Sequence, residues 1–234
     1  GTVLYPGEEF SAYETVSPFT EANGYAMAGS YLNGEVVDSM GGGICQVSTT
    51  LYNAVVRAEL NVTERSPHSM TVHYVDLSED AAIAGTYKDF KFVNSTEYPI
   101  YIEGYTTSDK KITFNIYGKE TRDKNRTISF ESQMVSETPA TTILQEDAGQ
   151  GIGYKAVSSK GSSGYVAELY KIVKVNGVET DRIKVNKSTY KGTNRVVTYG
   201  TAGDPTLSEN LRAAIAAQDE ALADANIAAA VPAQ

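Results

Sequence analysis

The sequence predicts an α+β fold: a mostly antiparallel β domain with a central helix entered at the cysteine, then an elongated all-β module and a C-terminal helical tail. Short segments rich in β-branched and aromatic residues alternate with Gly, Asn, Ser and Pro turn signals over most of the chain. One helical pattern interrupts them just after Cys45, and an alanine-rich stretch closes the chain. We place the domains at residues 1–119, 126–201 and 206–230.

Composition excludes several classes of protein. The formal net charge of −9 argues against a nucleic-acid partner, because neutralising phosphates requires basic patches. One cysteine among 234 residues rules out an intramolecular disulfide. No apolar run approaches the roughly 20 residues that span a bilayer. The chain opens at Gly1 in a strand-like segment and looks like an excised fragment, so a membrane anchor would belong to an N-terminal part outside it.

A hairpin and a helix are expected early in the chain. Asn33-Gly34 lies between two short β-type segments, 30–32 and 35–37, which is a strong hairpin signal. Apolar residues then recur at helical spacing at Val47, Leu51, Ala54, Val55 and Ala58. They predict a helix of about three or four turns that begins near Cys45.

The remaining segments are expected to be strands and a tail. We expect strands at residues 70–75, 90–93, 100–105 and 112–117, and in the second module at 127–130, 154–157, 165–175 and 183–186. Asn176-Gly177 predicts a hairpin turn. The tail has a narrow apolar stripe, so it is either a docked helix or an appendage; the stripe consists of Leu211, Ile215, Leu222 and Ile227.

Cys45 is the first candidate for chemistry. Gly41-Gly42-Gly43 allows a turn that would place the thiol at a helix start, where free N–H groups and the helix dipole favour a thiolate. The same N–H groups suit an oxyanion during acyl transfer, and Gln46 offers a further donor. The alternative is a small buried hydrophobic cysteine. A phosphate site fits less well, since no lysine follows as a P-loop requires.

A thiol nucleophile needs a base, and the chain has two histidines, His68 and His73. They lie five positions apart on one predicted strand and would therefore point to opposite faces. His68 shares its face with Met70, Val72 and Tyr74, the inward side. We therefore assign His68 as the base and keep His73 as the alternative.

Two further roles involve polar residues near His68. Arg65, three residues before it, either grips a substrate carboxylate or forms a surface ion pair. Four side chains just downstream are candidates to orient the imidazole: Asp76, Asp80, Asp89 and Asn94.

Residues 41–54, which read GGGICQVSTTLYNA, resemble the central signature of the VanW family. The resemblance extends over residues 1–119 through PGEEFS at 6–11, ERSPHS at 64–69, Asp80-Ala81, DFKFVN at 89–94 and YPIYI at 98–102. Residues 126–201 contain Gly149, Gly161, Gly164, Asn176-Gly177 and the run VVTYG at 196–200, and through them resemble the glycine-rich G5 module. That module is thought to adhere to N-acetylglucosamine-containing wall glycans. One departure concerns Asp80: the family often has a Gly-containing turn before Asp-Ala, where this chain reads DLSED.

The resemblance implies an extracellular protein at the cell surface of a Gram-positive bacterium. Some VanW proteins are cysteine L,D-transpeptidases that form 3-3 peptidoglycan cross-links through a thioester. Carried onto this chain, Cys45 is the nucleophile, His68 the base and Asp80 the third catalytic residue. Four residues are assigned to substrate or oxyanion binding: Gly43, Gln46, Arg65 and Ser69.

The partners implied are stem peptides and N-acetylglucosamine-containing glycan, and we expect neither a metal nor a cofactor. Two alternatives remain open. A peptidoglycan peptidase or amidase would use the same residues with water as the acceptor. A non-catalytic wall-binding protein would have a structural Cys45.

Overall fold

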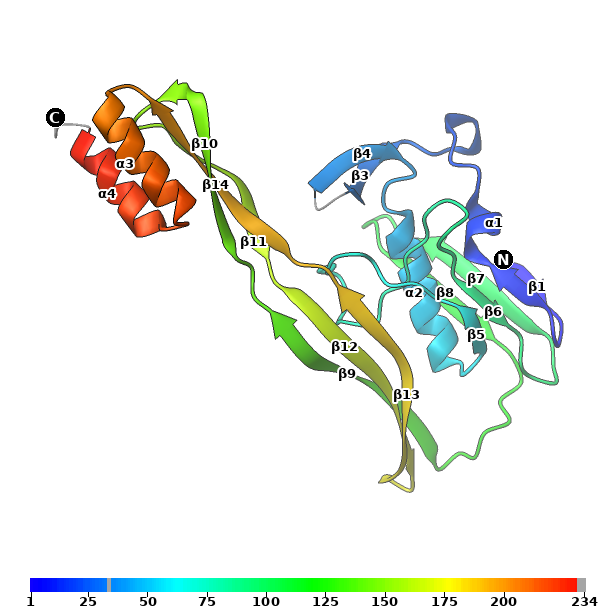
Figure 1. The fold of residues 1–234 in the computed structure, drawn as a ribbon. Helices are drawn as coiled ribbons and strands as arrows, with labels where there is room; N and C mark the ends of the chain where they lie inside the picture. The colour runs from blue at the N-terminus through cyan, green and yellow to red at the C-terminus, as the bar shows by residue number, and fades with distance from the viewer. Residues whose placement is uncertain (33–34, 231–234) are drawn as a thin grey trace. The chain divides into compact units, whose positions relative to one another are not determined.

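A computed structural model describes residues 1–32 and 35–230 of the chain (Figure 1). For residues 31, 32, 35 and 36 it describes the backbone alone. The described chain forms two compact units. The first unit contains residues 1–136 and 165–190, and the second contains residues 137–164 together with those from 191 onward. The α+β fold class is confirmed, because most pairings are antiparallel and the last two helices lie at the C-terminal end.

Three small sheets and one long helix build the N-terminal part of the first unit. The sheets are β1 (Thr2–Leu4), β7 (Ile100–Thr106) and β8 (Ile112–Tyr117); β2 (Glu9–Ser11), β6 (Lys91–Val93) and β5 (Asn61–Glu64); and β3 (Met27–Leu32) with β4 (Glu35–Met40). The helices are α1 (Ala12–Val16), the 3-10 turn η1 (Glu21–Asn23) and α2 (Ile44–Arg57). All the strand pairs of these sheets are antiparallel.

Helix α2 is the centre of the core. Its buried face carries Leu51, Tyr52 and Val55, which pack in one cluster with Phe90 and Phe92 from the β6 region. The Tyr52 and Phe90 rings meet edge to face at a centroid distance of 5.5 Å. Burial of this stripe fixes the rotation of α2 about its axis, and therefore the direction in which its first turn points.

Several local predictions for this part are confirmed. Helix α2 begins one residue before Cys45, and strands occur at 91–93, 100–106 and 112–117. Strands β3 and β4 pair antiparallel as the hairpin signal requires. The Asn33-Gly34 turn itself lies outside the described residues.

The prediction of a strand at residues 70–75 is wrong. In this segment, residues 70 and 73–75 form bends, and residues 71 and 72 have no regular secondary structure. Its neighbourhood uses its hydrogen-bonding groups differently: the His68 N–H donates to the Asp80 carboxylate, and the Ala82 N–H donates to the Ser66 carbonyl. The alternating apolar pattern therefore did not form a ladder. The face-parity argument that separated His68 from His73 has no structural basis.

A three-stranded sheet in the order β13-β12-β9 also belongs largely to the first unit: β9 (Arg126–Thr138), β12 (Gly164–Val175) and β13 (Val178–Tyr190). Asn176 and Gly177 have φ values of 52° and 80°, which confirms the predicted turn between β12 and β13. The strands are longer than predicted at 127–130 and 183–186, since polar residues continue the pairing beyond the apolar cores that marked them.

The second unit combines a sheet and two helices. Strand β14 (Thr193–Ala202) lies between β10 (Thr142–Gly151), to which it is parallel, and β11 (Lys155–Ser162), to which it is antiparallel. The sequence does not predict the strand at 142–151, because polar residues interrupt the alternation of apolar and polar side chains there. The tail is helical as predicted, but it forms two helices, α3 (Pro205–Ala216) and α4 (Glu220–Ala230), separated at Gln218 with φ 55°.

The tail helices are docked on their sheet. Leu211 and Ala214 of α3 are fully buried in one cluster with Val197 and Tyr199 of β14. The described residues include no helix long and apolar enough to cross a membrane.

Candidate active site

The glycine turn delivers Cys45 to the first turn of α2. Gly42 approaches β3 so closely that a Cβ atom there would lie 2.1 Å from the Ala28 carbonyl oxygen. Gly43 is the N-cap in the left-handed conformation, with φ 88°. Only glycine adopts both positions readily, so the run of glycines is required by the path of the chain into the helix.

Two backbone N–H groups at this turn are available to a ligand. The N–H groups of Ile44 and Gln46 donate to the carbonyls of Gly41 and Gly43. Within the described residues, those of Gly43 and Cys45 have no hydrogen-bond partner. Gly43 is exposed and Cys45 half-buried. Free N–H groups at a helix start next to a thiol are suited to stabilising an oxyanion.

Helix α2 also fixes the segment that follows Asp80. The Ser48 hydroxyl donates to the Ala81 carbonyl at 2.5 Å, and the Ala81 N–H donates to Thr49 Oγ1 at 3.0 Å. The Cys45 thiol donates to the Ile83 carbonyl at 3.3 Å. The thiol and the Asp80 backbone are therefore tied to one rigid element.

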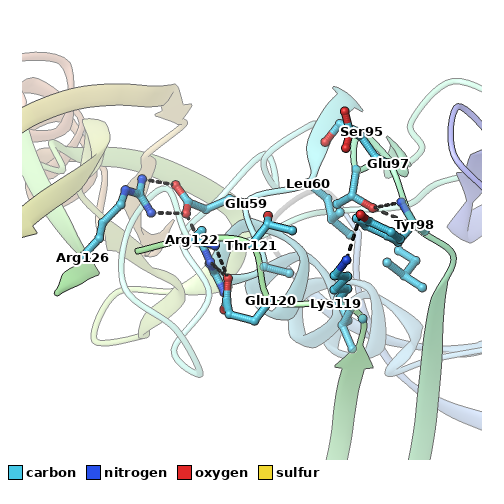
Figure 2. A pocket seen from close by; sticks show the side chains of 15 residues that line it. Glu59, Leu60, Ser95, Glu97, Tyr98, Lys119, Glu120, Thr121, Arg122 and Arg126 are labelled. Carbon is cyan, nitrogen blue, oxygen red and sulfur yellow. Dashed lines mark hydrogen bonds and ion pairs between the residues drawn. The ribbon is translucent and has the colours of Figure 1, made fainter. Parts of the chain in front are cut away.

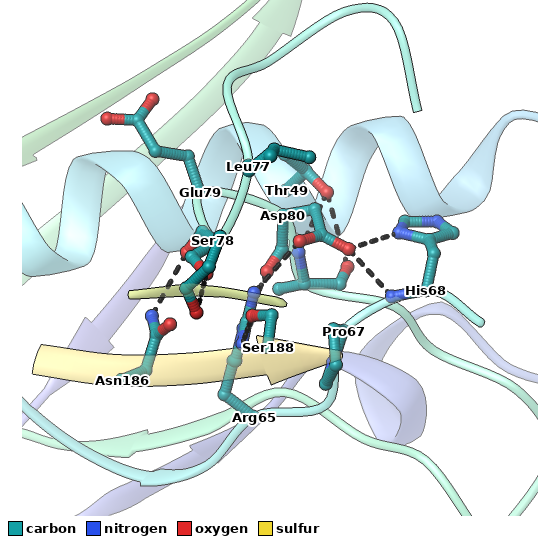
Figure 3. Close-up of polar contacts among 12 residues, drawn as sticks. Thr49, Arg65, Pro67, His68, Leu77, Ser78, Glu79, Asp80, Asn186 and Ser188 are labelled. Carbon is teal, nitrogen blue, oxygen red and sulfur yellow. Dashed lines mark hydrogen bonds and ion pairs between the residues drawn. The ribbon is translucent and has the colours of Figure 1, made fainter. Parts of the chain in front are cut away.

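Asp80 and His68 form a buried pair (Figure 3). His68 Nδ1 lies 2.6 Å from Asp80 Oδ2, and the His68 backbone N–H donates to the same oxygen at 2.7 Å. The Asp80 side chain is 1% exposed and the His68 side chain 11%. With Nδ1 engaged by Asp80, Nε2 is the ring nitrogen left to act on other groups; the Tyr74 hydroxyl lies 3.5 Å from it.

The electrostatics of the pair favour charge on both partners. Burial of the His68 ring lowers its pKa, but the Asp80 carboxylate and the nearby Cys45 thiol outweigh burial and raise the pKa to about 9. Burial raises the pKa of Asp80, but hydrogen bonds from His68 and the charge of Arg65 leave it lowered overall. His68 is therefore an imidazolium at neutral pH, and Asp80 is a carboxylate.

Arg65 donates hydrogen bonds to Asp80 and helps to hold its carboxylate in place. Its side chain is 6% exposed, so it does not form a surface ion pair. Nη2 donates to Asp80 Oδ1 at 2.9 Å, Nε donates to the Asp80 carbonyl at 2.6 Å, and Nη1 donates to Ser188 Oγ at 2.8 Å. The structure thus places Arg65 among the groups that hold Asp80.

In the described part of the chain, none of the other candidates makes a hydrogen bond or ion pair with the side chain of His68 or Asp80. Gln46 and Ser69 are exposed, and so is His73. Asp89 accepts hydrogen bonds from Ser11 and Tyr13. Two further candidates to orient the imidazole are also placed elsewhere: Asn94 donates to the Leu4 and Tyr98 carbonyls, and Asp76 is exposed.

Three residues near the pair were not predicted for the site. Tyr74 had been counted only as a neighbour on a strand face, and Tyr190 and Ser188 of β13 carried no signal. Tyr190 donates from its hydroxyl to Asp80 Oδ1 at 2.6 Å across 110 residues of sequence. Local pattern cannot reveal such a contact.

Other features of the first unit do not bear on Cys45. A hollow of about 550 Å³ is lined by Glu59, Tyr98 and Arg122, among other residues (Figure 2), and Cys45 is not part of its lining. In the described part of the chain, no group of three or more His, Cys, Asp or Glu side chains is arranged to hold a metal ion.

Comparison with known proteins bears on the whole chain. The family model "VanW like protein" matches residues 1–117, and the model "G5 domain" matches residues 130–202. The chain is 42% identical to the uncharacterized protein YoaR of Bacillus subtilis over 100 residues, which is 43% of this chain and 33% of that protein. It is 28% identical to the vancomycin B-type resistance protein VanW of Enterococcus faecalis over 124 residues, or 50% of this chain and 44% of that protein.

The chain thus spans less than half the length of either relative. Among solved structures, the IgA1 protease G5 domain matches 36% of this chain and all of that one, at 24% identity and a TM-score of 0.27. The HP0197 G5 structure matches 32% of this chain and 97% of that one, at 20% identity and a TM-score of 0.21.

The two family matches occur in the order that the sequence motifs predict. Together they indicate a cell-wall-associated protein, and G5 domains are associated with binding N-acetylglucosamine-containing glycans. Because the VanW match covers half of the 234 residues, this chain belongs to the VanW-like family and carries a G5 domain after its VanW domain.

Proposed function

We propose that this protein is a cysteine L,D-transpeptidase that forms 3-3 cross-links between peptidoglycan stem peptides at a Gram-positive cell surface. The observation that carries the proposal is the position of Cys45 at the open start of α2, beside the buried His68–Asp80 pair. A thiol, an imidazole and an orienting carboxylate are the groups that acyl transfer through a thioester requires.

The acylation step uses the charge state of His68. The raised pKa of His68, about 9, keeps its ring protonated beside Cys45 at neutral pH, and the proposed nucleophile is the deprotonated sulfur of Cys45. The thiolate attacks the scissile carbonyl carbon of a tetrapeptide donor, and a C–S bond forms while the carbonyl oxygen becomes an oxyanion. The Gly43 and Cys45 N–H groups, which have no partner within the described residues, are the donors available to this charge. His68 Nε2 then gives its proton to the departing amine as the C–N bond breaks.

The transfer step restores both residues. Neutral His68 accepts a proton from the amine of a neighbouring stem as that amine attacks the thioester carbonyl. A new C–N bond forms, the C–S bond breaks, and Cys45 leaves as the thiolate beside the restored imidazolium. Asp80 stays ionised throughout and keeps Nδ1 protonated, so that proton transfer occurs only at Nε2.

The G5 domain supports the choice of substrate. A domain class associated with N-acetylglucosamine-containing glycans would keep the protein at the polymer that carries the stems. Binding to the polymer raises the effective concentration of donor and acceptor stems at Cys45.

The test is incubation of the purified protein with disaccharide-tetrapeptide, followed by mass spectrometry of the products and of the protein. We expect dimers with a 3-3 linkage and an acyl adduct on Cys45, both absent in Cys45→Ala. Shortened monomers without dimers would instead identify a peptidase or amidase, with water as the acceptor. If mass spectrometry finds neither a product nor an acyl adduct, the proposal is contradicted and the wall-binding interpretation stands.

The two histidines provide a matched pair of variants. His68→Ala removes the proton donor and should abolish dimer formation and adduct. His73→Ala changes an exposed histidine five residues away and should leave both unchanged. Equal effects of the two substitutions would argue against a specific role for His68.

A further inference from the structure

The loop that carries Asp80 is held by the sheet of the G5 domain. The Ser132 hydroxyl of β9 donates to the Leu77 carbonyl at 2.6 Å. The Ser78 hydroxyl donates to the Ala167 carbonyl of β12 at 3.0 Å, and the Asn186 amide of β13 donates to the Ser78 carbonyl at 3.0 Å. Every strand of this sheet therefore bonds to the loop just before Asp80, and all these residues belong to the first compact unit.

Two residues of β13 reach the charged groups themselves. The Tyr190 hydroxyl donates to Asp80 Oδ1 at 2.6 Å and accepts the Ser78 N–H at 2.7 Å. Ser188 Oγ accepts from Arg65 Nη1 at 2.8 Å (Figure 3). Tyr190 is 2% exposed and Ser188 1% exposed. Burial and the Asp80 charge raise the pKa of Tyr190 to about 12, so its hydroxyl remains a donor.

A second group of ion pairs fixes the same sheet to the VanW domain. Glu59, just after α2, accepts from Arg126 Nη2 of β9 at 2.7 Å (Figure 2). It also accepts from Lys171 of β12 at 2.8 Å. Arg122 contributes a third cation at 3.3 Å. The sheet is thus attached at both the Glu59 cluster and the Asp80 loop, which restricts its movement relative to Asp80.

We propose that strand β13 of the G5 domain is part of the transpeptidase site, with Tyr190 and Ser188 as positioning residues for the Asp80–His68 pair. This inference rests on the proposed function for its catalytic meaning. Among the described residues, neither of the two makes a hydrogen bond to the thiol or the imidazole. They act by fixing the carboxylate that orients the imidazole.

The chemistry of Asp80 explains why this support is needed. Its carboxylate is fully buried and accepts two bonds at Oδ2, both from His68. Oδ1 accepts from Arg65 and Tyr190. Without donors at Oδ1 the carboxylate could rotate, and the short contact with Nδ1 would lengthen. The VanW domain supplies one of the two Oδ1 donors, and the G5 strand supplies the other.

The test uses the full chain with Tyr190→Phe, Ser188→Ala and the double variant. Cys45 alkylation by iodoacetamide is followed against pH, because its upper inflection reports loss of the His68 proton. Cross-linking kinetics give kcat and KM separately. Tyr154→Phe is the matched control: it makes the same change at an exposed tyrosine of the G5 domain.

We expect the upper inflection to move down by roughly half a unit or more in Tyr190→Phe, and further in the double variant, because a loosened Asp80 raises the pKa of His68 less. kcat should fall about tenfold or more with KM little changed. Tyr154→Phe should match the wild type. An unchanged or raised inflection in the folded double variant would overturn the inference, and Ser188→Ala provides the milder case if Tyr190→Phe does not fold.

The two proposals can fail separately. If the wild type forms no cross-links but the inflection still moves in the variants, β13 positions the pair and the proposed function is wrong. If the wild type forms cross-links and the variants keep its pH profile and kcat, the function stands and the positioning role is wrong.

Discussion

Replacing Asp80 by Asn tests the centre of the site, because it removes one charge and almost no volume. The carboxylate receives four hydrogen bonds, at 2.6–2.9 Å, from Arg65, Tyr190 and both His68 donors. The asparagine amide keeps one acceptor oxygen. Its NH₂ group would face donors that the carboxylate oxygen accepts from in the wild type, so those hydrogen bonds would be lost. His68 would then lose the ionic partner that outweighs its burial.

The size of the effect follows from the pKa of His68. It is about 9 against an ordinary 6.5, a difference of about 2.5 units, which corresponds to about 3 kcal/mol favouring the imidazolium. This figure is a net effect, because burial of the ring opposes the shift and the Cys45 sulfur adds to it; without Asp80, burial is less opposed and the pKa of His68 falls back towards its ordinary value. A pKa of 6.5 would leave about a quarter of the imidazole protonated at pH 7.

The expected result is therefore a fall in kcat of roughly a hundredfold at pH 7, with the wrong tautomer adding to the lost proton. NMR titration of His68 should show a pKa lowered by about two units. Because Arg65 is left buried beside a neutral group, the variant should also lose about 3 kcal/mol of stability, so assays must be run below its melting transition.

Asp89→Asn is the matched control. Asp89 is a second buried carboxylate in the same unit, and it accepts from Ser11 and Tyr13 instead of His68. Its replacement should lower stability without moving the His68 titration. If Asp80→Asn kept the wild-type pKa of His68 and the wild-type kcat, the assignment of Asp80 as the orienting carboxylate would be refuted.

Three further predictions follow from local geometry and charge. Gly42→Ala should destabilise the fold by about 1–3 kcal/mol in chemical denaturation, because the new Cβ would lie 2.1 Å from the Ala28 carbonyl oxygen; a stability equal to wild type would show that β3 moves freely. Arg126, Lys171 and Arg122 lower the pKa of Glu59 to about 2. The contribution of Glu59 to stability is therefore present above a pH of about 4.5 and is lost as the pH falls towards 2. Glu59→Gln should flatten that acid dependence in thermal melts, whereas an unchanged slope would contradict it. In the wild type, the raised pKa of His68 contributes stability below pH 6.5 that is lost as pH rises through about 9, and cross-linking should decline over the same upper range; constant activity to pH 10 would argue against an imidazolium donor.

The elements that could be predicted from sequence are those whose conformation is determined by residues close together in the chain. Helix α2 was predictable because its apolar residues recur at helical spacing, and its start because glycines were needed before it. The Asn176-Gly177 turn was predictable because both residues adopt positive φ at low cost. In each case a few neighbouring residues determine the conformation.

The strand predicted at 70–75 shows the opposite case. Met70, Val72 and Tyr74 alternate as a strand would, yet none of the strands within residues 1–32 and 35–230 pairs with them. Period-two alternation reports that alternate side chains differ in polarity, and a bent loop against a core can satisfy that equally well. His68 was selected by an argument from this strand, whereas its contact with Asp80 depends on the folding of the loop between them.

The support of Asp80 could not be predicted for a more general reason. A buried carboxylate must receive donors on all sides, and these come from two widely separated stretches of the sequence: Arg65 and His68 in one, and Tyr190 in the other. No one of these positions has a motif that indicates a shared acceptor. If Tyr190 completes this set, the orientation of His68 depends on a folded G5 sheet. The G5 domain would then both associate the protein with glycan and complete the site that acts on the stems, and substitutions in β13 would impair chemistry without reducing wall binding.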